Sequence, residues 1–199
     1  MNPRTPIPRR TLGWLMLAWA PACLAHAEHG AATSFLAGMG HPVSGLDHVL
    51  AMVAVGLWGA QLGNPALWVL PVVFPLIMAG GGLLGLLGMP LPGVEFGIAL
   101  SGVLLGFAVA ARQRPPLCLA VALVAIFAVF HGHAHGTELP EGADGLRYSL
   151  GFVIATGALH AGGIALGMVQ KLPHGAALLR GLGGIVGVGG LYFLVKAVA

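Results

Sequence analysis

The stretch that organises the chain is His41-Pro42-Val43-Ser44-Gly45-Leu46-Asp47-His48, which leads directly into the apolar run 49–62. Two imidazoles and a carboxylate therefore stand where a membrane helix is expected to begin. Ionisable groups are costly inside a bilayer, so their presence there indicates a function. We expect them to meet a second histidine-rich stretch, Phe130-His131-Gly132-His133-Ala134-His135-Gly136-Thr137-Glu138.

The composition is that of an integral membrane protein. Hydrophobic residues make up 57% of the chain and charged residues only 8%, whereas soluble domains carry about 25% charged residues. Basic residues cluster only at the extreme N-terminus (Arg4, Arg9 and Arg10), so we expect no nucleic-acid partner. The nine histidines outnumber the six acidic residues, which is unusual for a membrane protein.

Residues 1–27 have the pattern of a cleavable signal peptide. Three arginines precede the short apolar run 12–24, and Ala25-His26-Ala27 has the spacing of a cleavage site. An uncleaved signal anchor is the alternative. Cleavage would leave residues 28–199 as a single transmembrane domain whose N-terminus lies on the outer side.

Six apolar segments follow, and each is close to the roughly 20 residues that cross a bilayer as a helix. Glycine and proline punctuate the breaks between them. The predicted fold is an all-α membrane protein, a bundle of six transmembrane helices after the signal peptide. The predicted helices lie near 43–62, 66–88, 94–111, 116–133, 147–169 and 175–198.

Loop charges agree with this topology. Arg112 and Lys171 fall in loops predicted to be cytoplasmic, whereas Glu141 and Asp144 fall in an outer loop. The same topology places both histidine-rich stretches and Glu95 at the outer ends of their helices. Since those residues were not used to derive the topology, their convergence is independent support for one shared site.

The first stretch offers three metal-binding groups. His41 and His48 are seven residues apart and lie nearly on one helical face, and Asp47 points to a neighbouring face. Asp47 can ligate a metal or orient an imidazole from behind, as carboxylates often do. A helix cap with interfacial histidines is the structural alternative.

The second stretch has the usual helical spacing of metal ligands. His131 and His135 are four residues apart and share a face, and Glu138 adds an oxygen. His133 points elsewhere unless the helix unwinds at the flanking glycines. Nitrogen with some oxygen suits nickel, cobalt, zinc or copper(II) better than magnesium or calcium.

Two further residues are weaker candidates. His160 lies deep in the predicted helix 147–169 and is either a second station on an ion path or a neutral buried histidine. Glu95 lies at the outer start of the predicted helix 94–111 and either attracts cations, ligates a metal or faces water.

The residues by themselves leave more than one function open. A metal transporter is favoured, and since no ATP-binding loop pattern occurs in the chain, transport would be secondary. An intramembrane zinc hydrolase is the alternative, with the histidines and Asp47 holding zinc and Ser101 serving the substrate. A helix-bound haem anchor is a third option.

Three quoted stretches carry a resemblance to a known family. HPVSGLDHVLAMVAVGLWGAQLG, FHGHAHGTELP and GFVIATGALHAGG together resemble the HupE/UreJ family of nickel permeases, over about residues 30–170. The resemblance implies secondary uptake of Ni²⁺, or of Co²⁺, in bacteria that make hydrogenase or urease, and no enzymatic activity. By motif position it implies metal-binding roles for His41, Asp47, His48, His131, His135 and Glu138, whereas His133 occupies a position that the family leaves open.

The resemblance also sets expectations for cofactors and partners. We expect no permanently bound cofactor, because the metal is the transported substrate. The expected partners are the divalent ion and the lipid bilayer, and a homo-oligomer is left open. The expected location is the bacterial inner membrane, with several spans and a periplasmic mature N-terminus.

Overall fold

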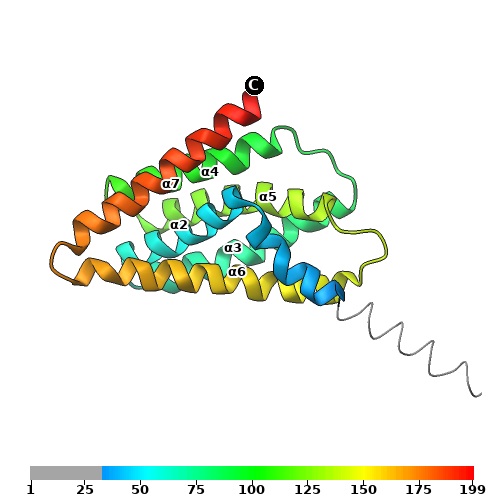
Figure 1. The fold of residues 1–199 in the computed structure, drawn as a ribbon, viewed down its shortest axis with the longest axis horizontal. Helices are drawn as coiled ribbons and strands as arrows, with labels where there is room; N and C mark the ends of the chain where they lie inside the picture. Colours follow the sequence, from blue (N-terminus) through cyan, green and yellow to red (C-terminus); the bar gives the residue numbers. More distant parts are fainter. Residues whose placement is uncertain (1–32) are drawn as a thin grey trace, which may run out of the picture.

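The computed structural model describes residues 33–199, and every regular element in that part of the chain is helical (Figure 1). A helix over Thr33–Ser44 comes first. The elements that follow are α2 (Leu46–Leu62), α3 (Ala66–Leu86), α4 (Val94–Ala110), α5 (Leu117–Thr137), α6 (Gly145–Gly167), the 3-10 helix η1 (Met168–Lys171) and α7 (Gly175–Val198). The predicted signal peptide, 1–27, lies outside the described residues.

Four helices are long and apolar enough to cross a bilayer, namely α3, α5, α6 continued through η1, and α7. The Thr33–Ser44 helix and α2 form a fifth candidate, although the chain bends by 81° between them. The remaining helix, α4, has 17 residues. That is about 25 Å at 1.5 Å per residue, somewhat less than the roughly 30 Å hydrocarbon core. Each predicted segment is thus a helix, but by length and composition the described residues contain four or five candidate spans, against the six predicted.

The start of the first predicted segment, 43–62, is wrong. His41 and Pro42 belong to the last turns of the Thr33–Ser44 helix, and α2 begins only at Leu46. The break falls at Gly45, whose φ of −101° and ψ of 114° are extended. The Thr33–Ser44 helix packs against α6, because Gly38 has no side chain and lets the backbone approach the Tyr148 carbonyl closely.

The end of the fourth predicted segment, 116–133, is also wrong, because α5 continues to Thr137. The glycines in this stretch do not unwind the helix. They allow close packing instead, since a Cβ at Gly132 would clash with the Met78 carbonyl and one at Gly136 with the Gly82 carbonyl. The other four segments agree with α3, α4, α6 and α7 to within two residues.

Glycines occupy the closest contacts of three helix pairs. In the pair α3 and α5, the residue numbers of the contacting positions rise together along the two helices, so these helices are parallel. Gly56 of α2 packs on Gly163 of α6, and Gly106 of α4 packs on Gly183 of α7. Small residues of this kind let membrane helices approach each other closely.

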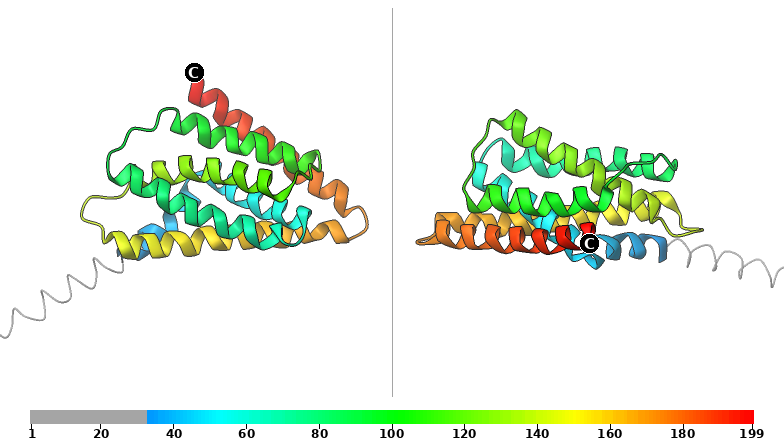
Figure 2. Two further views of the ribbon diagram at one scale, coloured as in Figure 1. Left: turned by 180° about the vertical axis from the view of Figure 1, so that it is seen from behind. Right: turned by 90° about the horizontal axis from the view of Figure 1, so that it is seen from above.

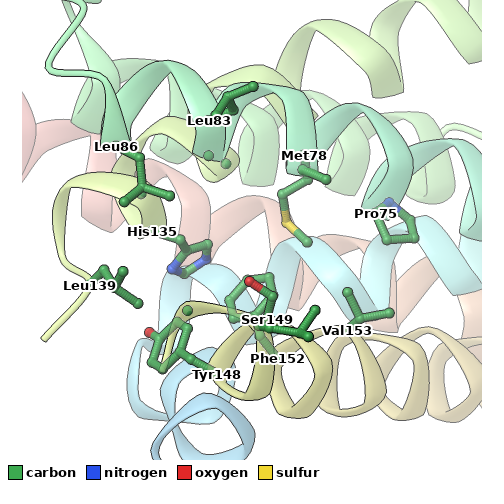
Figure 3. Close-up of a pocket in the computed structure, with 16 residues that line it drawn as sticks. Pro75, Met78, Leu83, Leu86, His135, Leu139, Tyr148, Ser149, Phe152 and Val153 are labelled. Atoms are coloured by element: carbon green, nitrogen blue, oxygen red, sulfur yellow. The ribbon is translucent and has the colours of Figure 1, made fainter. Parts of the chain in front are cut away.

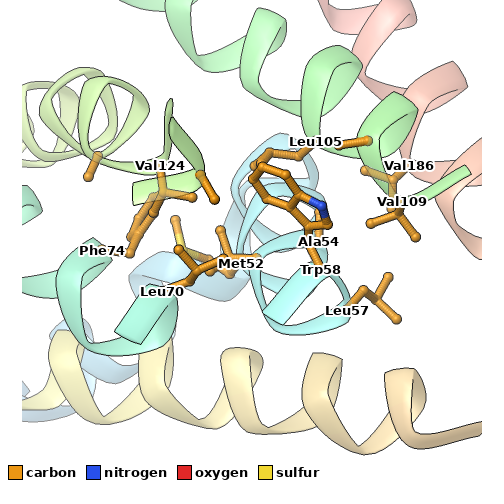
Figure 4. Close-up of a cluster of buried hydrophobic side chains, with 14 of the residues drawn as sticks. Met52, Ala54, Leu57, Trp58, Leu70, Phe74, Leu105, Val109, Val124 and Val186 are labelled. Atoms are coloured by element: carbon orange, nitrogen blue, oxygen red, sulfur yellow. The ribbon is translucent and has the colours of Figure 1, made fainter. Parts of the chain in front are cut away.

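A hydrophobic core fills the centre between these pairs (Figure 4). Trp58 of α2 packs near Leu105 and Val109 of α4, and its indole Nε1 donates a hydrogen bond to the Gln113 carbonyl at 3.1 Å. Phe74 of α3 is fully buried in the same cluster. The core therefore holds α2 between α3 and α4, which positions the first turn of α2 for the site described below.

The two ends of the bundle differ in charge. The α3–α4 and α5–α6 loops lie at one end with the Thr33–Ser44 helix, and the other three loops lie at the opposite end (Figures 1 and 2). We call the first the acidic end, because its α5–α6 loop carries Glu138 and Glu141. We call the second the basic end, because it carries Arg112 and Lys171.

Candidate metal site

The two histidine-rich stretches meet at the acidic end. The bend between the Thr33–Ser44 helix and α2 leaves His41 beside the end of α5. The His41 ring centroid lies 4.7 Å from that of His135, and His41 Nε2 lies 3.1 Å from Glu138 Oε2. Residues almost a hundred positions apart therefore share one contact surface, as the topology predicted.

Asp47 sets the orientation of His48. Its Oδ1 accepts a hydrogen bond from the His48 backbone N–H at 2.9 Å and lies 3.0 Å from the ring Nδ1. A carboxylate only accepts, so the His48 Nδ1 carries the proton and Nε2 carries a lone pair. That Nε2 is buried and has no hydrogen-bond partner among the described residues. Asp47 thus acts as an orienting group behind His48, an arrangement common at metal-binding histidines.

Ser101 of α4 sets the orientation of His131. The Ser101 hydroxyl donates its one hydrogen to the Ile98 carbonyl at 2.6 Å. Its oxygen is 3.0 Å from His131 Nε2, and therefore accepts the Nε2–H of that ring. The lone pair of His131 is consequently on Nδ1, which is buried and lacks a partner within residues 33–199.

His135 lies between these two rings and the outer group. Its ring centroid is 4.4 Å from that of His48, which is in turn 4.7 Å from that of His131. Both nitrogens of His135 are buried without a partner in the described chain. His48, His131 and His135 therefore each present an unused nitrogen, and we call these three residues the imidazole cluster.

An outer group overlaps the imidazole cluster through His135. One ligand atom each from His41, His135 and Glu138 lies within 4.8 Å of the others. Two ligands at 2.0–2.1 Å on opposite sides of one ion are about 4 Å apart, so a modest closure would suffice to bind. The Glu138 side chain is 54% exposed, and so this group faces the outside of the bundle.

Three weaker candidates lie away from the cluster. His133 Nε2 bonds to the Met89 carbonyl at 2.7 Å, so this residue anchors the α3–α4 loop. Glu95 is exposed at the start of α4, and within the described residues it has no hydrogen bond or ion pair to the cluster. His160 lies deeper, buried in α6.

Sequence reasoning missed several neighbours of the site. Ser101 was considered only as a residue of the hydrolase alternative, yet it orients His131 from another helix. Phe152 packs at 4.4 Å from the His135 ring, and Tyr148 at 5.8 Å from that of His41. The spacing of four between Tyr148 and Phe152 on one predicted helix was the available signal.

A cavity of about 390 Å³ reaches the imidazole cluster from the side (Figure 3). It lies between α3, α5 and α6, and most of its lining is apolar, including Leu83, Leu86 and Val153. His135 is the one histidine in this lining, and its ring points into the space above Phe152. Mostly apolar side chains therefore line the cavity beside the cluster.

The fold and site define a class: a helical membrane protein with converging imidazoles at one end of its bundle. The family model described as HupE / UreJ protein matches residues 14–193. The chain is 45% identical over 181 residues to Protein HupE of Rhizobium leguminosarum bv. viciae, and the aligned region covers 90% of this chain and 95% of that protein. No solved structure matches it. The chain therefore belongs to the HupE/UreJ family.

Proposed function

We propose that this protein is a secondary transporter that takes up divalent transition-metal ions, with Ni²⁺ as the first candidate and Co²⁺ as the second. The observation that carries the proposal is the set of buried imidazole nitrogens without partners on His48, His131 and His135. An unsatisfied buried polar group costs about 1–3 kcal/mol. Several unsatisfied nitrogens on adjoining rings favour a ligand that binds all of them at once.

The ligand types fit this cargo. Neutral imidazole suits nickel, cobalt, zinc and copper(II), and carboxylates complement it. In this proposal the outer group receives a partly hydrated ion, and His135, which belongs to both groups, passes it on to His48 and His131. The proposed metal-binding residues are His41, His48, His131, His135 and Glu138, with Asp47 orienting His48.

The charge distribution supports an inward direction of transport. The acidic end would attract cations outside the cell, and the basic end would face the cytoplasm by the positive-inside rule. The proposed location is the bacterial inner membrane, with the N-terminus of the mature chain in the periplasm. The proposed role is nickel supply for the maturation of hydrogenase or urease.

Radioactive nickel uptake tests the proposal in cells that express wild type, His48→Ala or His135→Ala at matched membrane levels. Wild type should accumulate nickel, and the uptake by both variants should be at least about tenfold lower. Competition by cobalt and zinc would rank the ions. His174→Ala is the matched control, because this histidine precedes α7 at the basic end and should leave uptake unchanged.

The opposite result has a definite meaning. Wild-type protein that is inserted and abundant but accumulates no metal would refute transport and move the zinc hydrolase forward. The geometry gives that alternative little support, since Ser101 is fully buried and its hydroxyl is already engaged by Ile98 and His131.

A further inference from the structure

A buried stripe on α6 leads from the outer site toward the middle of the bundle. Tyr148, Phe152, Thr156 and His160 recur every four residues, so they follow one face of the helix, and all four are buried. The first two contact the histidines of the outer site. At 1.5 Å per residue, His160 lies about 12 Å further along α6 than Phe152.

The inner half of this stripe is polar and unsatisfied. The His160 side chain is 1% exposed, and neither ring nitrogen has a hydrogen-bond partner in the part of the chain described. Thr156 is fully buried, and its hydroxyl also lacks a partner there. Threonine hydroxyls in helices commonly bond to a carbonyl one turn back, so an unused hydroxyl beside an unused imidazole points to a missing ligand.

The facing helix presents a free carbonyl to His160. Pro75 has no N–H, so the carbonyl of Pro71, one turn earlier in α3, has no helical donor. This carbonyl lies close to the His160 ring without forming a hydrogen bond of ordinary geometry. One ring N–H directed at it would leave the lone pair of the other nitrogen for a metal, because a backbone carbonyl commonly orients a ligating histidine in this way.

Phe74 adjoins both the imidazole cluster and His160. Its ring centroid lies 5.5 Å from that of His131 and 5.5 Å from that of His160, with steep edge contacts to both. Phe74 is fully buried in the hydrophobic core. One aromatic ring therefore contacts a histidine of each group.

We propose that His160 and Thr156 form a second, deeper station for the transported cation, which passes from the imidazole cluster along the edge of Phe74. This inference rests on the proposed transport function. The deeper station offers one imidazole and one hydroxyl, against three imidazoles in the cluster, so it should bind the ion more weakly. Such a gradient suits transit, because conduction needs sites that the ion can leave.

Cobalt binding to a cysteine variant tests whether metal reaches this position. His160→Cys is made in full-length protein that also carries Cys23→Ser and Cys118→Ser, so that the introduced thiol is the only one. Purified protein is then titrated with Co²⁺. A bound thiolate produces a sulfur-to-cobalt charge-transfer band in the near ultraviolet, and we expect this band for His160→Cys. Ala161→Cys is the control, because residue 161 is exposed on the outside of the same turn.

Uptake and equilibrium binding complete the test. His160→Leu should lower nickel uptake at least about tenfold while the purified variant still binds Ni²⁺ at the imidazole cluster. The deeper station would be overturned if His160→Leu took up nickel as fast as wild type. It would also be overturned if the cobalt band of His160→Cys were no stronger than that of Ala161→Cys. Failure of the transport proposal itself is recognised separately, because wild type would then accumulate no nickel.

Discussion

Two faces of the last turns of α5 carry histidines that are all buried but that differ in the hydrogen bonds of their ring nitrogens. His131 and His135 face the first turn of α2, and three of their four ring nitrogens lack partners in the described chain. His133 faces the α3–α4 loop, and its ring bonds to the Met89 carbonyl. Burial alone therefore does not separate the histidines that we propose to bind metal from His133, whereas the hydrogen bonding of their ring nitrogens does.

The difference has an energetic meaning. A satisfied buried hydrogen bond contributes about 0.5–1.5 kcal/mol to stability, whereas an unsatisfied buried group costs about 1–3 kcal/mol. The unsatisfied nitrogens of His131 and His135 thus lower the stability of the protein without a ligand, and a ligand bound to them would remove this cost. The face with His133 is complete without a ligand. The predictions below test this contrast, from the largest expected effect to the smallest.

Replacing His131 by leucine should abolish stabilisation by nickel. At a nickel concentration 1,000-fold above Kd, wild type should gain about 4 kcal/mol against unfolding, and His131→Leu should gain almost none. Without metal the variant should be no less stable, because the substitution removes an unsatisfied nitrogen. Thermal unfolding in detergent with and without nickel measures both effects. A full nickel-dependent shift in the variant would contradict this role for His131.

The packing of α5 on α3 should matter for both faces. A valine at Gly136 would clash with the Gly82 carbonyl, and overpacking of this kind costs about 1–3 kcal/mol. We expect Gly136→Val to lower the thermal stability and the amount of inserted protein. Gly80→Ala is the control, since a Cβ at that position of α3 meets no atom within 4 Å. Equal stability of both variants would show that this contact does not hold the helices.

Replacing Asp47 by asparagine should weaken nickel binding without removing a ligand. Loss of an outer-shell partner typically costs 10–100-fold in metal affinity, so we expect Asp47→Asn to raise the nickel Kd by about that factor. Isothermal titration of purified protein provides the measurement. Asp144→Asn should leave Kd unchanged, because Asp144 caps α6 through the Arg147 N–H and asparagine caps equally well. An unchanged nickel Kd in Asp47→Asn would contradict the proposed role of Asp47 in orienting His48.

The smallest effect is expected for His133→Gln. The glutamine amide can still donate to the Met89 carbonyl, so the free energy of unfolding should change by less than about 1.5 kcal/mol. The nickel Kd should equal that of wild type, as determined by the same titration. A loss of affinity comparable to that of His131→Leu would erase the distinction between the two faces of α5.

Much of this organisation could be predicted from the sequence because its causes are local. The apolar runs and their proline and glycine breaks predicted the six helices α2 to α7, although not the Thr33–Ser44 helix that precedes them. The spacing of four predicted that His131 and His135 share a face, and that His133 points away. The orienting partners could not be predicted in the same way. Ser101 comes from α4 and Met89 from a loop, and which histidine each one meets depends on how the helices pack.

The sequence by itself determined that the chain forms apolar helices and that its two histidine-rich stretches lie at the same end of the bundle, since both follow from the length and order of the apolar runs. Only the tertiary structure decided which imidazoles touch and which nitrogens remain unused. The bend at Gly45 brings His41 beside His135, and the glycine contacts of α5 with α3 set how α5 faces the bundle. Both depend on close backbone approach between segments far apart in the chain, where a single Cβ would change the distance between helices.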